Sequence, residues 1–139
     1  MKVYSYSGKL VSKNFNKYRV DWDKKSRSKI QFAVKQFLRP YWNKEIVYEE
    51  APVVGTRMKI DFWNATRKIC IEVDGNQHEQ FNKHFHNNSR LNYLYSIRRD
   101  SSKEDWIEKN DLKLIRIKEN EIKLLSEEWI NEKFGFKIV

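Results

Sequence analysis

Apolar and polar residues follow one another along this chain with two periods, a longer one near its start and a shorter one in its middle. The longer period is helical and appears as an apolar stripe formed by Ile30, Ala33, Val34, Phe37, Leu38 and Tyr41. Ser26 or Ser28 can cap the N-terminus of this helix, and Pro40 lies near its end. The pattern therefore predicts an amphipathic helix that packs one face on a core.

Four segments are typical of strands, because they alternate in polarity or are short and apolar. They cover residues 46–50, 57–63, 68–73 and 112–117. The turn sequence Asn64-Ala65-Thr66 makes the second and third segments a predicted hairpin, which brings Asp61 towards the third segment. The first 23 residues have no clear period, although Tyr18, Val20 and Trp22 suggest a short strand or an extended arm.

The second half of the chain is mainly helical in its pattern. We expect one helix over 89–99, further helical structure over 100–110 that begins at Ser101 or Ser102, and a helical turn over 119–125. A last helix opens at Ser126 and stops at Gly135. The order of elements predicts an α/β fold in which a meander of three strands is joined by a fourth, parallel strand after a helical crossover.

Size and composition indicate one folded domain. The chain has 139 residues, four Gly and two Pro, which suits a single hydrophobic core. Its one cysteine, Cys70, lies inside an apolar run and reads as a small buried residue, so we expect a reducing, cytoplasmic compartment. No apolar run is long enough to span a membrane, and the N-terminus lacks the apolar stretch of a signal peptide, so we expect no membrane partner.

The net charge of +9 favours a polyanionic partner, chiefly nucleic acid. A basic cluster of Lys24, Lys25, Arg27 and Lys29 precedes the first predicted helix. This cluster is either a solvated approach to the helix or a set of phosphate contacts, and the overall charge favours the second interpretation.

Acidic residues at the end of the third strand are the strongest candidates for chemistry. Glu72 and Asp74 are two residues apart and so share one face of that strand, which Gly75 and His78 follow. Neighbouring acids are costly unless a cation or a proton lies between them. A strand that simply reaches the surface is the plain alternative. A zinc site built from His78, His84 and His86 is a weaker one, because their spacing lacks a helical i, i+4 pair.

Several motifs resemble the PD-(D/E)XK nucleases, in particular the branch of the very-short-patch-repair endonucleases and the EDxHD homing endonucleases. They are G-T-R-M-K-I-D-F, then I-C-I-E-V-D-G-N-Q-H, the entering helix S-R-S-K-I-Q-F-A-V-K-Q-F-L, and R-R-D-S-S-K-E-D-W-I-E-K-N-D-L-K-L-I-R-I. The resemblance implies a restriction-endonuclease-like core with a mixed four- or five-stranded sheet flanked by helices, in the order α-β-β-β-α-β-α. It divides the chain into an N-terminal arm (1–25), a catalytic core (26–118) and a C-terminal helical segment (119–139).

The resemblance also implies roles for individual residues. Asp61 and Glu72 match the metal-binding acids, helped by the Val73 carbonyl, and the metal is Mg²⁺ or Mn²⁺. His78 matches the histidine near the scissile phosphate and becomes the expected proton carrier, because Asp74 stands where many relatives have a lysine. Less direct matches are Asp100, a later acid of the branch, Lys103, which could supply the missing positive charge, and Gln31, which stands where relatives have a helical glutamate.

The function implied is a metal-dependent DNA endonuclease, encoded by a phage and acting in a bacterial cell. Expected DNA-backbone contacts are Lys24, Lys25, Arg27, Arg98 and Arg99. Recognition of a long site would need a homodimer, an arm or a partner. A nucleic-acid-binding protein without catalysis and a nuclease selective for junctions or mismatches are the alternatives.

Overall fold

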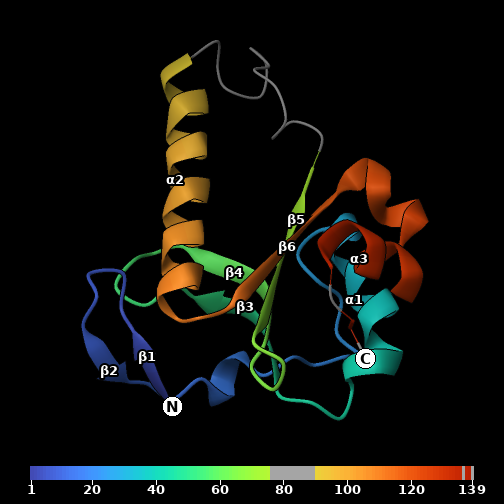
Figure 1. The fold of residues 1–139 in the computed structure, drawn as a ribbon, viewed down its shortest axis with the longest axis horizontal. Coiled ribbons are helices and arrows are strands. Elements are labelled where there is room, and N and C mark those ends of the chain that lie inside the picture. Colours follow the sequence, from blue (N-terminus) through green and yellow to red (C-terminus); the bar gives the residue numbers. More distant parts are fainter. Residues whose placement is uncertain (76–89, 136, 139) are drawn as a thin grey trace.

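The computed structural model describes residues 1–75, 90–135, 137 and 138, and shows an α/β fold built on a four-stranded sheet (Figure 1). Its strands are β3 (Val47–Pro52), β4 (Lys59–Asn64), β5 (Ile69–Asp74) and β6 (Lys113–Lys118). The remaining elements are β1 (Lys2–Tyr4), β2 (Leu10–Ser12), η1 (Asn16–Tyr18), α1 (Lys29–Trp42), α2 (Arg90–Lys109), η3 (Glu119–Leu124) and α3 (Glu127–Phe134).

The sheet has the strand order β3-β4-β5-β6. The first three strands pair antiparallel as a meander, and β6 lies parallel to β5 after the crossover through α2. Both features confirm the expected mixed sheet. The predicted strand bounds are correct to within two residues at each end. Pro52, which we expected in a loop, is the last residue of β3.

Helices α1 and α3 cover one face of the sheet (Figure 1). Of the two predicted caps, Ser28 is the one that caps α1, by accepting a hydrogen bond from the Gln31 N–H, and Pro40 lies in the last turn of the helix. The orientation of α1 differs from the expected one. Its most buried line consists of Gln31, Val34, Lys35, Leu38 and Trp42, while Ile30, Ala33, Phe37 and Tyr41 are only partly buried. The buried line was not evident from the sequence because two of its members are polar.

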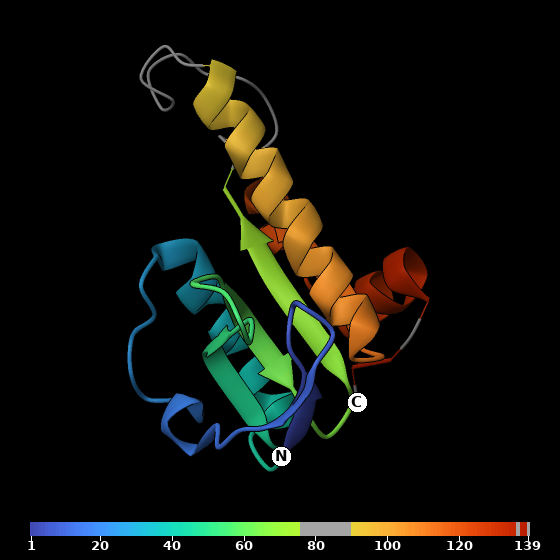
Figure 2. The same cartoon turned by 90° about the vertical axis from the view of Figure 1, so that its left-hand side faces the viewer.

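The opposite face of the sheet is covered by α2 and by the hairpin of β1 and β2 (Figure 2). Val3 and Phe15 enter this core together with Trp63, Trp106 and the buried thiol of Cys70. The expected arm or strand over Tyr18–Trp22 is reduced to a single bridge between Arg19 and Tyr48. The sequence does not predict the hairpin that precedes this segment, because strands of three residues are too short to show a period.

Helix α2 is one continuous element of 20 residues, where the sequence had suggested two helical segments. Ser101 and Ser102 were expected to begin the second segment, but both lie inside the helix, and the Ser102 hydroxyl donates to the Arg98 carbonyl one turn earlier. Trp106 and Ile107 anchor its C-terminal half in the core. Its N-terminal half extends past the sheet (Figures 1 and 2).

The C-terminal helix forms where the sequence predicts it. Ser126 caps α3 by accepting from the Trp129 N–H, and Gly135 ends it in the left-handed region, with φ of 76°. Ile130 and Ile138 then join the core on the α1 face. None of the helices in the described part of the chain combines the length and the apolarity that a membrane crossing requires.

Candidate active site

Glu72 and Asp74 lie on the face of β5 that α2 covers. Their neighbour Cys70 belongs to the core beneath α2, whereas Ile69 and Ile71 belong to the α1 core, so the strand alternates as predicted. Glu72 is 3% exposed, and the side chain of Asp74 is partly buried. The interpretation of a strand that merely reaches the surface is therefore wrong for Glu72.

Asp61 joins Glu72 at a point where two strands separate. The pairing of β4 with β5 runs from Asn64–Ile69 to Phe62–Ile71 and ends there. In the next row, the Asp61 carboxylate accepts a hydrogen bond of 2.8 Å from the Val73 N–H, which takes the place of a ladder bond. The side chain of Asp61 thereby occupies the fork between the strands and lies beside that of Glu72.

The row that contains Asp61 is also strained on the other side. Glu49 pairs with Phe62 and Ala51 pairs with Ile60, but Glu50 and Asp61, which lie between these pairs, are not themselves paired. Glu50 has a φ of 52°, in the left-handed region that disfavours residues with a side chain. Tyr48 and Ala51 are three residues apart and yet both face the α2 side, so the alternation of side chains between the two faces of β3 shifts by one residue near Glu50. Backbone strain of about 1–3 kcal/mol persists only where surrounding structure enforces it, and it concentrates at functional sites.

The pKa of Glu72 rises from its ordinary value of 4.5 to about 8. Burial is the largest cause, because a buried carboxylate loses its hydration. The neighbouring Asp61 raises the pKa further through charge repulsion and a side-chain hydrogen bond, whereas Lys103 lowers it. At neutral pH the pair therefore favours a proton or a cation between its two carboxyl groups.

Among the residues that the structure describes, Lys103 forms an ion pair with Glu72. It projects from α2, and its Nζ lies 2.9 Å from Glu72 Oε1, with its side chain only 20% exposed. That oxygen is fully buried and lacks a hydrogen bond of good geometry from any described group. Lys103 thus places a positive charge against the acidic pair. This charge comes from helix α2, whereas the expected lysine would have come from position 74 of β5.

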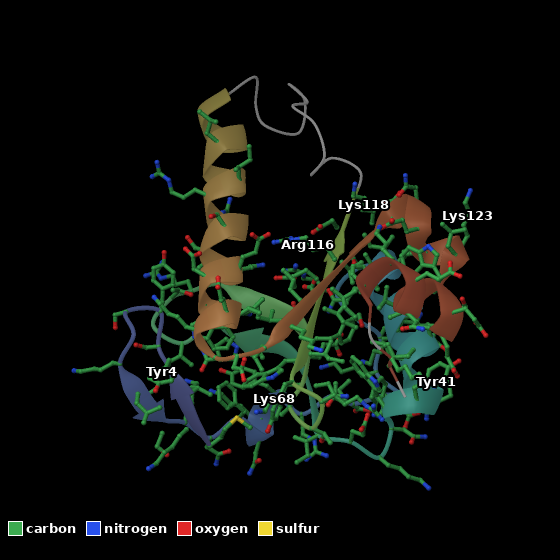
Figure 3. The ribbon with its side chains drawn as sticks, in the orientation of Figure 1. Tyr4, Tyr41, Lys68, Arg116, Lys118 and Lys123 are labelled. Carbon is green, nitrogen blue, oxygen red and sulfur yellow. The ribbon has the colours of Figure 1, made fainter. Side chains whose placement is uncertain are left out.

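Arg116 on β6 links Asp74 to α2. Its Nη1 lies 3.5 Å from Asp74, and its Nε and Nη2 donate to Glu104, the residue after Lys103. Figure 3 shows Arg116 between α2 and β5. The two acids of β5 therefore have separate basic neighbours, Lys103 for Glu72 and Arg116 for Asp74. Arg116 could not be identified from the sequence because it sits in an ordinary alternating strand.

Gln31 belongs to a different cluster. Its side-chain amide donates to Glu49 at 3.0 Å, and Glu49 also accepts from Ser26 and from the buried Lys35. The structure thus brings Asp61, Glu72 and Lys103 together but directs Gln31 to another carboxylate.

The remaining candidates are distributed over the surface or lie outside what the structure describes. Lys24, Lys25 and Arg27 line a pocket beside β3, and Arg98 and Arg99 are exposed on α2. His78, together with His84 and His86, lies outside the described residues, and so does the side chain of Asp100.

The donor set suits a hard divalent cation that keeps most of its water. Mg²⁺ is commonly bound through one or two carboxylates plus waters and substrate oxygens. Asp61 and Glu72 supply two such carboxylates at one point, and a buried oxygen of Glu72 lacks a good hydrogen bond. Within the described ranges, no group of three His, Cys, Asp or Glu side chains could hold a metal ion, so a cage made of protein ligands alone is not present there.

Comparison with known proteins finds little similarity. The sequence matches no protein-family model, and no solved structure matches it. It is 29% identical over 89 residues to "Uncharacterized protein 033L" of Invertebrate iridescent virus 3. This match covers 63% of the chain and 44% of the viral protein, so the chain spans less than half the length of that relative. The description of the viral protein names no activity.

Proposed function

We propose that this protein is a metal-dependent endonuclease that hydrolyses phosphodiester bonds in DNA, on a core of the PD-(D/E)XK type. The observation that carries the proposal is the buried pair of Asp61 and Glu72 at the fork of β4 and β5, with Lys103 against it. The helix-strand-strand-strand-helix-strand order and the parallel β6 agree with the core that the sequence motifs imply.

The chemistry of the pair fits phosphodiester hydrolysis. Asp61 and Glu72 would hold Mg²⁺ or Mn²⁺, assisted by the Val73 carbonyl. The bound cation would supply neutralising charge at the phosphate and lower the pKa of a water. Lys103 contributes a second positive charge at the same point, where negative charge develops on the phosphate oxygens.

The sequence adds a proton carrier and a substrate class. His78 follows the acidic strand by four residues and has the side chain whose ordinary pKa lies nearest to neutrality, so we assign proton transfer to it. The net charge of +9 supports a nucleic acid as substrate.

Plasmid cleavage tests the proposal. Wild-type protein should cut supercoiled plasmid with Mg²⁺ or Mn²⁺, and Asp61→Asn and His78→Ala should each lower the rate by about a hundredfold or more. Asp105→Asn is a matched control, because Asp105 is an exposed acid on α2. If the wild type cuts none of linear, nicked, mismatched or branched DNA with either metal, the protein is not this enzyme. If Asp61→Asn cuts as fast as Asp105→Asn, the site is misplaced.

A second candidate is a nucleic-acid-binding protein that does not cleave. It is favoured by Asp74, which stands in place of a strand lysine and is paired with Arg116. DNA binding at full strength without metal-dependent cleavage would support this candidate over the endonuclease.

A further inference from the structure

A strongly basic pocket lies along the outer edge of the sheet, beside β3. It has a volume of about 430 Å³ and is lined by seven basic and three acidic side chains. Six of the basic residues are exposed, namely Lys17, Arg19, Lys24, Lys25, Arg27 and Lys59. In the part of the chain that the structure describes, no carboxylate lies within ion-pairing distance of Lys24, Lys25 or Lys59. Seven basic against three acidic side chains give the lining of the pocket a net positive charge.

The seventh basic residue that lines this pocket, Lys35, is buried. Its side chain is 2% exposed, and its Nζ donates to Glu49 at 2.8 Å and to the Lys24 carbonyl at 2.6 Å. Glu49 in turn accepts from the Ser26 hydroxyl at 2.6 Å. The loop Lys24–Ser26 is thus bonded at both ends to one largely buried ion pair, Lys35 and Glu49, which we call the clasp.

The clasp explains why the buried line of α1 contains polar residues. A buried ion pair contributes little net stability compared with apolar side chains of the same size, so its presence calls for another role. Here it fixes the backbone of a loop that carries Lys24 and Lys25, so that less conformational entropy is lost when those side chains bind a ligand.

The pocket adjoins the candidate active site. Glu50 in its wall lies in the row of Asp61, and Lys59 lies on β4 two residues before Asp61. Neighbouring strands of a sheet are about 5 Å apart, so Glu50 lies about one strand from Asp61.

We propose that this pocket binds the phosphodiester backbone of DNA next to the bond to be cut, and that the clasp holds the loop Lys24–Ser26 in its binding conformation. This inference rests on the proposed function for its substrate, and it adds Lys17, Arg19 and Lys59 to the DNA contacts. It also assigns Gln31, Lys35 and Glu49 to positioning the loop.

Binding of a short fluorescent DNA duplex, measured by anisotropy over a series of salt concentrations, tests the proposal. The protein carries Asp61→Asn throughout, so that cleavage does not interfere. The variant K24Q/K25Q/K59Q removes three pocket charges, and K9Q/K44Q/K123Q removes three exposed charges that do not line the pocket. Lys123, for example, lies on η3, well away from β3 (Figure 3).

The pocket variant should bind at least about tenfold more weakly at low salt, and its plot of log affinity against log salt should lose roughly 2 to 3 of its slope. The control variant should lose much less of both. Ser26→Ala, which frees one end of the loop but keeps every charge, should weaken binding while leaving the slope nearly unchanged. Equal losses in the pocket and control variants would overturn the binding site, and wild-type affinity in Ser26→Ala would overturn the role of the clasp.

The outcome is separable from that of the proposed function. If the pocket variant loses DNA binding while the wild type cuts no DNA, the pocket stands and the nuclease does not. If the wild type cuts DNA and the pocket variant binds as tightly as the control, the nuclease stands and the pocket does not. Absence of any duplex binding by the protein with Asp61→Asn would refute the pocket, whatever the cleavage result.

Discussion

Glu72→Gln should stabilise the metal-free protein at alkaline pH, and the gain should grow with pH. Glu72 has a folded-state pKa of about 8 against an ordinary value of 4.5, so between these values the folded state holds a proton that the unfolded state has released. Stability linked to this group is therefore complete below about pH 4.5 and is lost as the pH rises to about 8. Glutamine carries no charge at any of these values and avoids the loss.

The magnitude follows from the displacement of the pKa. Each unit of pKa corresponds to about 1.4 kcal/mol, so the change from 4.5 to about 8 amounts to about 5 kcal/mol above pH 8. Total unfolding free energies of single domains are about 5–15 kcal/mol, so this loss is large enough to measure. The side chain is 4% exposed, and solvent screening therefore reduces the effect little.

Urea unfolding in the presence of EDTA, at several pH values from acid to alkaline, measures this difference. The unfolding free energy of Glu72→Gln minus that of the wild type should rise with pH and level off above about pH 8. Glu108→Gln, at an exposed glutamate of α2, serves as the control and should show a difference that does not change with pH. A difference for Glu72→Gln that is equally flat would refute the reasoning, because it would mean that folding does not displace the pKa of Glu72.

Three further predictions concern the site and the fold. Added Mn²⁺ should raise the melting temperature of the wild type more at pH 8.5 than at pH 6.5, because the cation must displace the proton of Glu72. It should leave the melting temperature of Asp61→Asn unchanged, and an equal rise in both proteins would place the cation elsewhere. Lys103→Met should lower the rate of DNA cleavage by about a hundredfold. It should also move the pH dependence of that rate to higher pH, because Lys103 lowers the pKa of Glu72, and a lower rate with the same pH dependence would contradict this coupling. Gly135→Ala should lower the unfolding free energy by about 1 kcal/mol, because the φ of 76° at the end of α3 strains any residue with a Cβ. Gly135→Asn should lower the unfolding free energy by less, and equal stability of all three proteins in urea unfolding would show that this cap is unstrained.

Much of the fold could be predicted from local pattern. The strands β3 to β6 follow from alternation and apolar runs, and the helices α1 and α3 follow from their stripes and their serine caps. These signals are local, since each depends on residues a few positions apart. The hairpin of β1 and β2 could not be predicted in this way, because three residues per strand carry no period and their burial depends on Trp106, about a hundred residues later.

Part of the candidate site is likewise a property of the sequence. The two-residue spacing places Glu72 and Asp74 on one face of β5, and the turn at Asn64–Thr66 brings Asp61 of β4 next to β5. The sequence also suggested Lys103 as a source of positive charge, but only because a lysine was missing at Asp74. The sequence could not predict that Glu72 is more deeply buried than Asp74, because this difference depends on how α2 packs over the sheet.

The tertiary structure decided which groups meet. It separated β4 from β5 at Asp61, set Lys103 against Glu72 and Arg116 against Asp74, and turned the polar residues Gln31 and Lys35 of α1 inward to Glu49. Each of these contacts joins segments from different elements, whose distance and angle depend on the packing of the whole domain. The sequence by itself therefore determined the strands and the acids they carry, whereas packing determined their charges, partners and exposure.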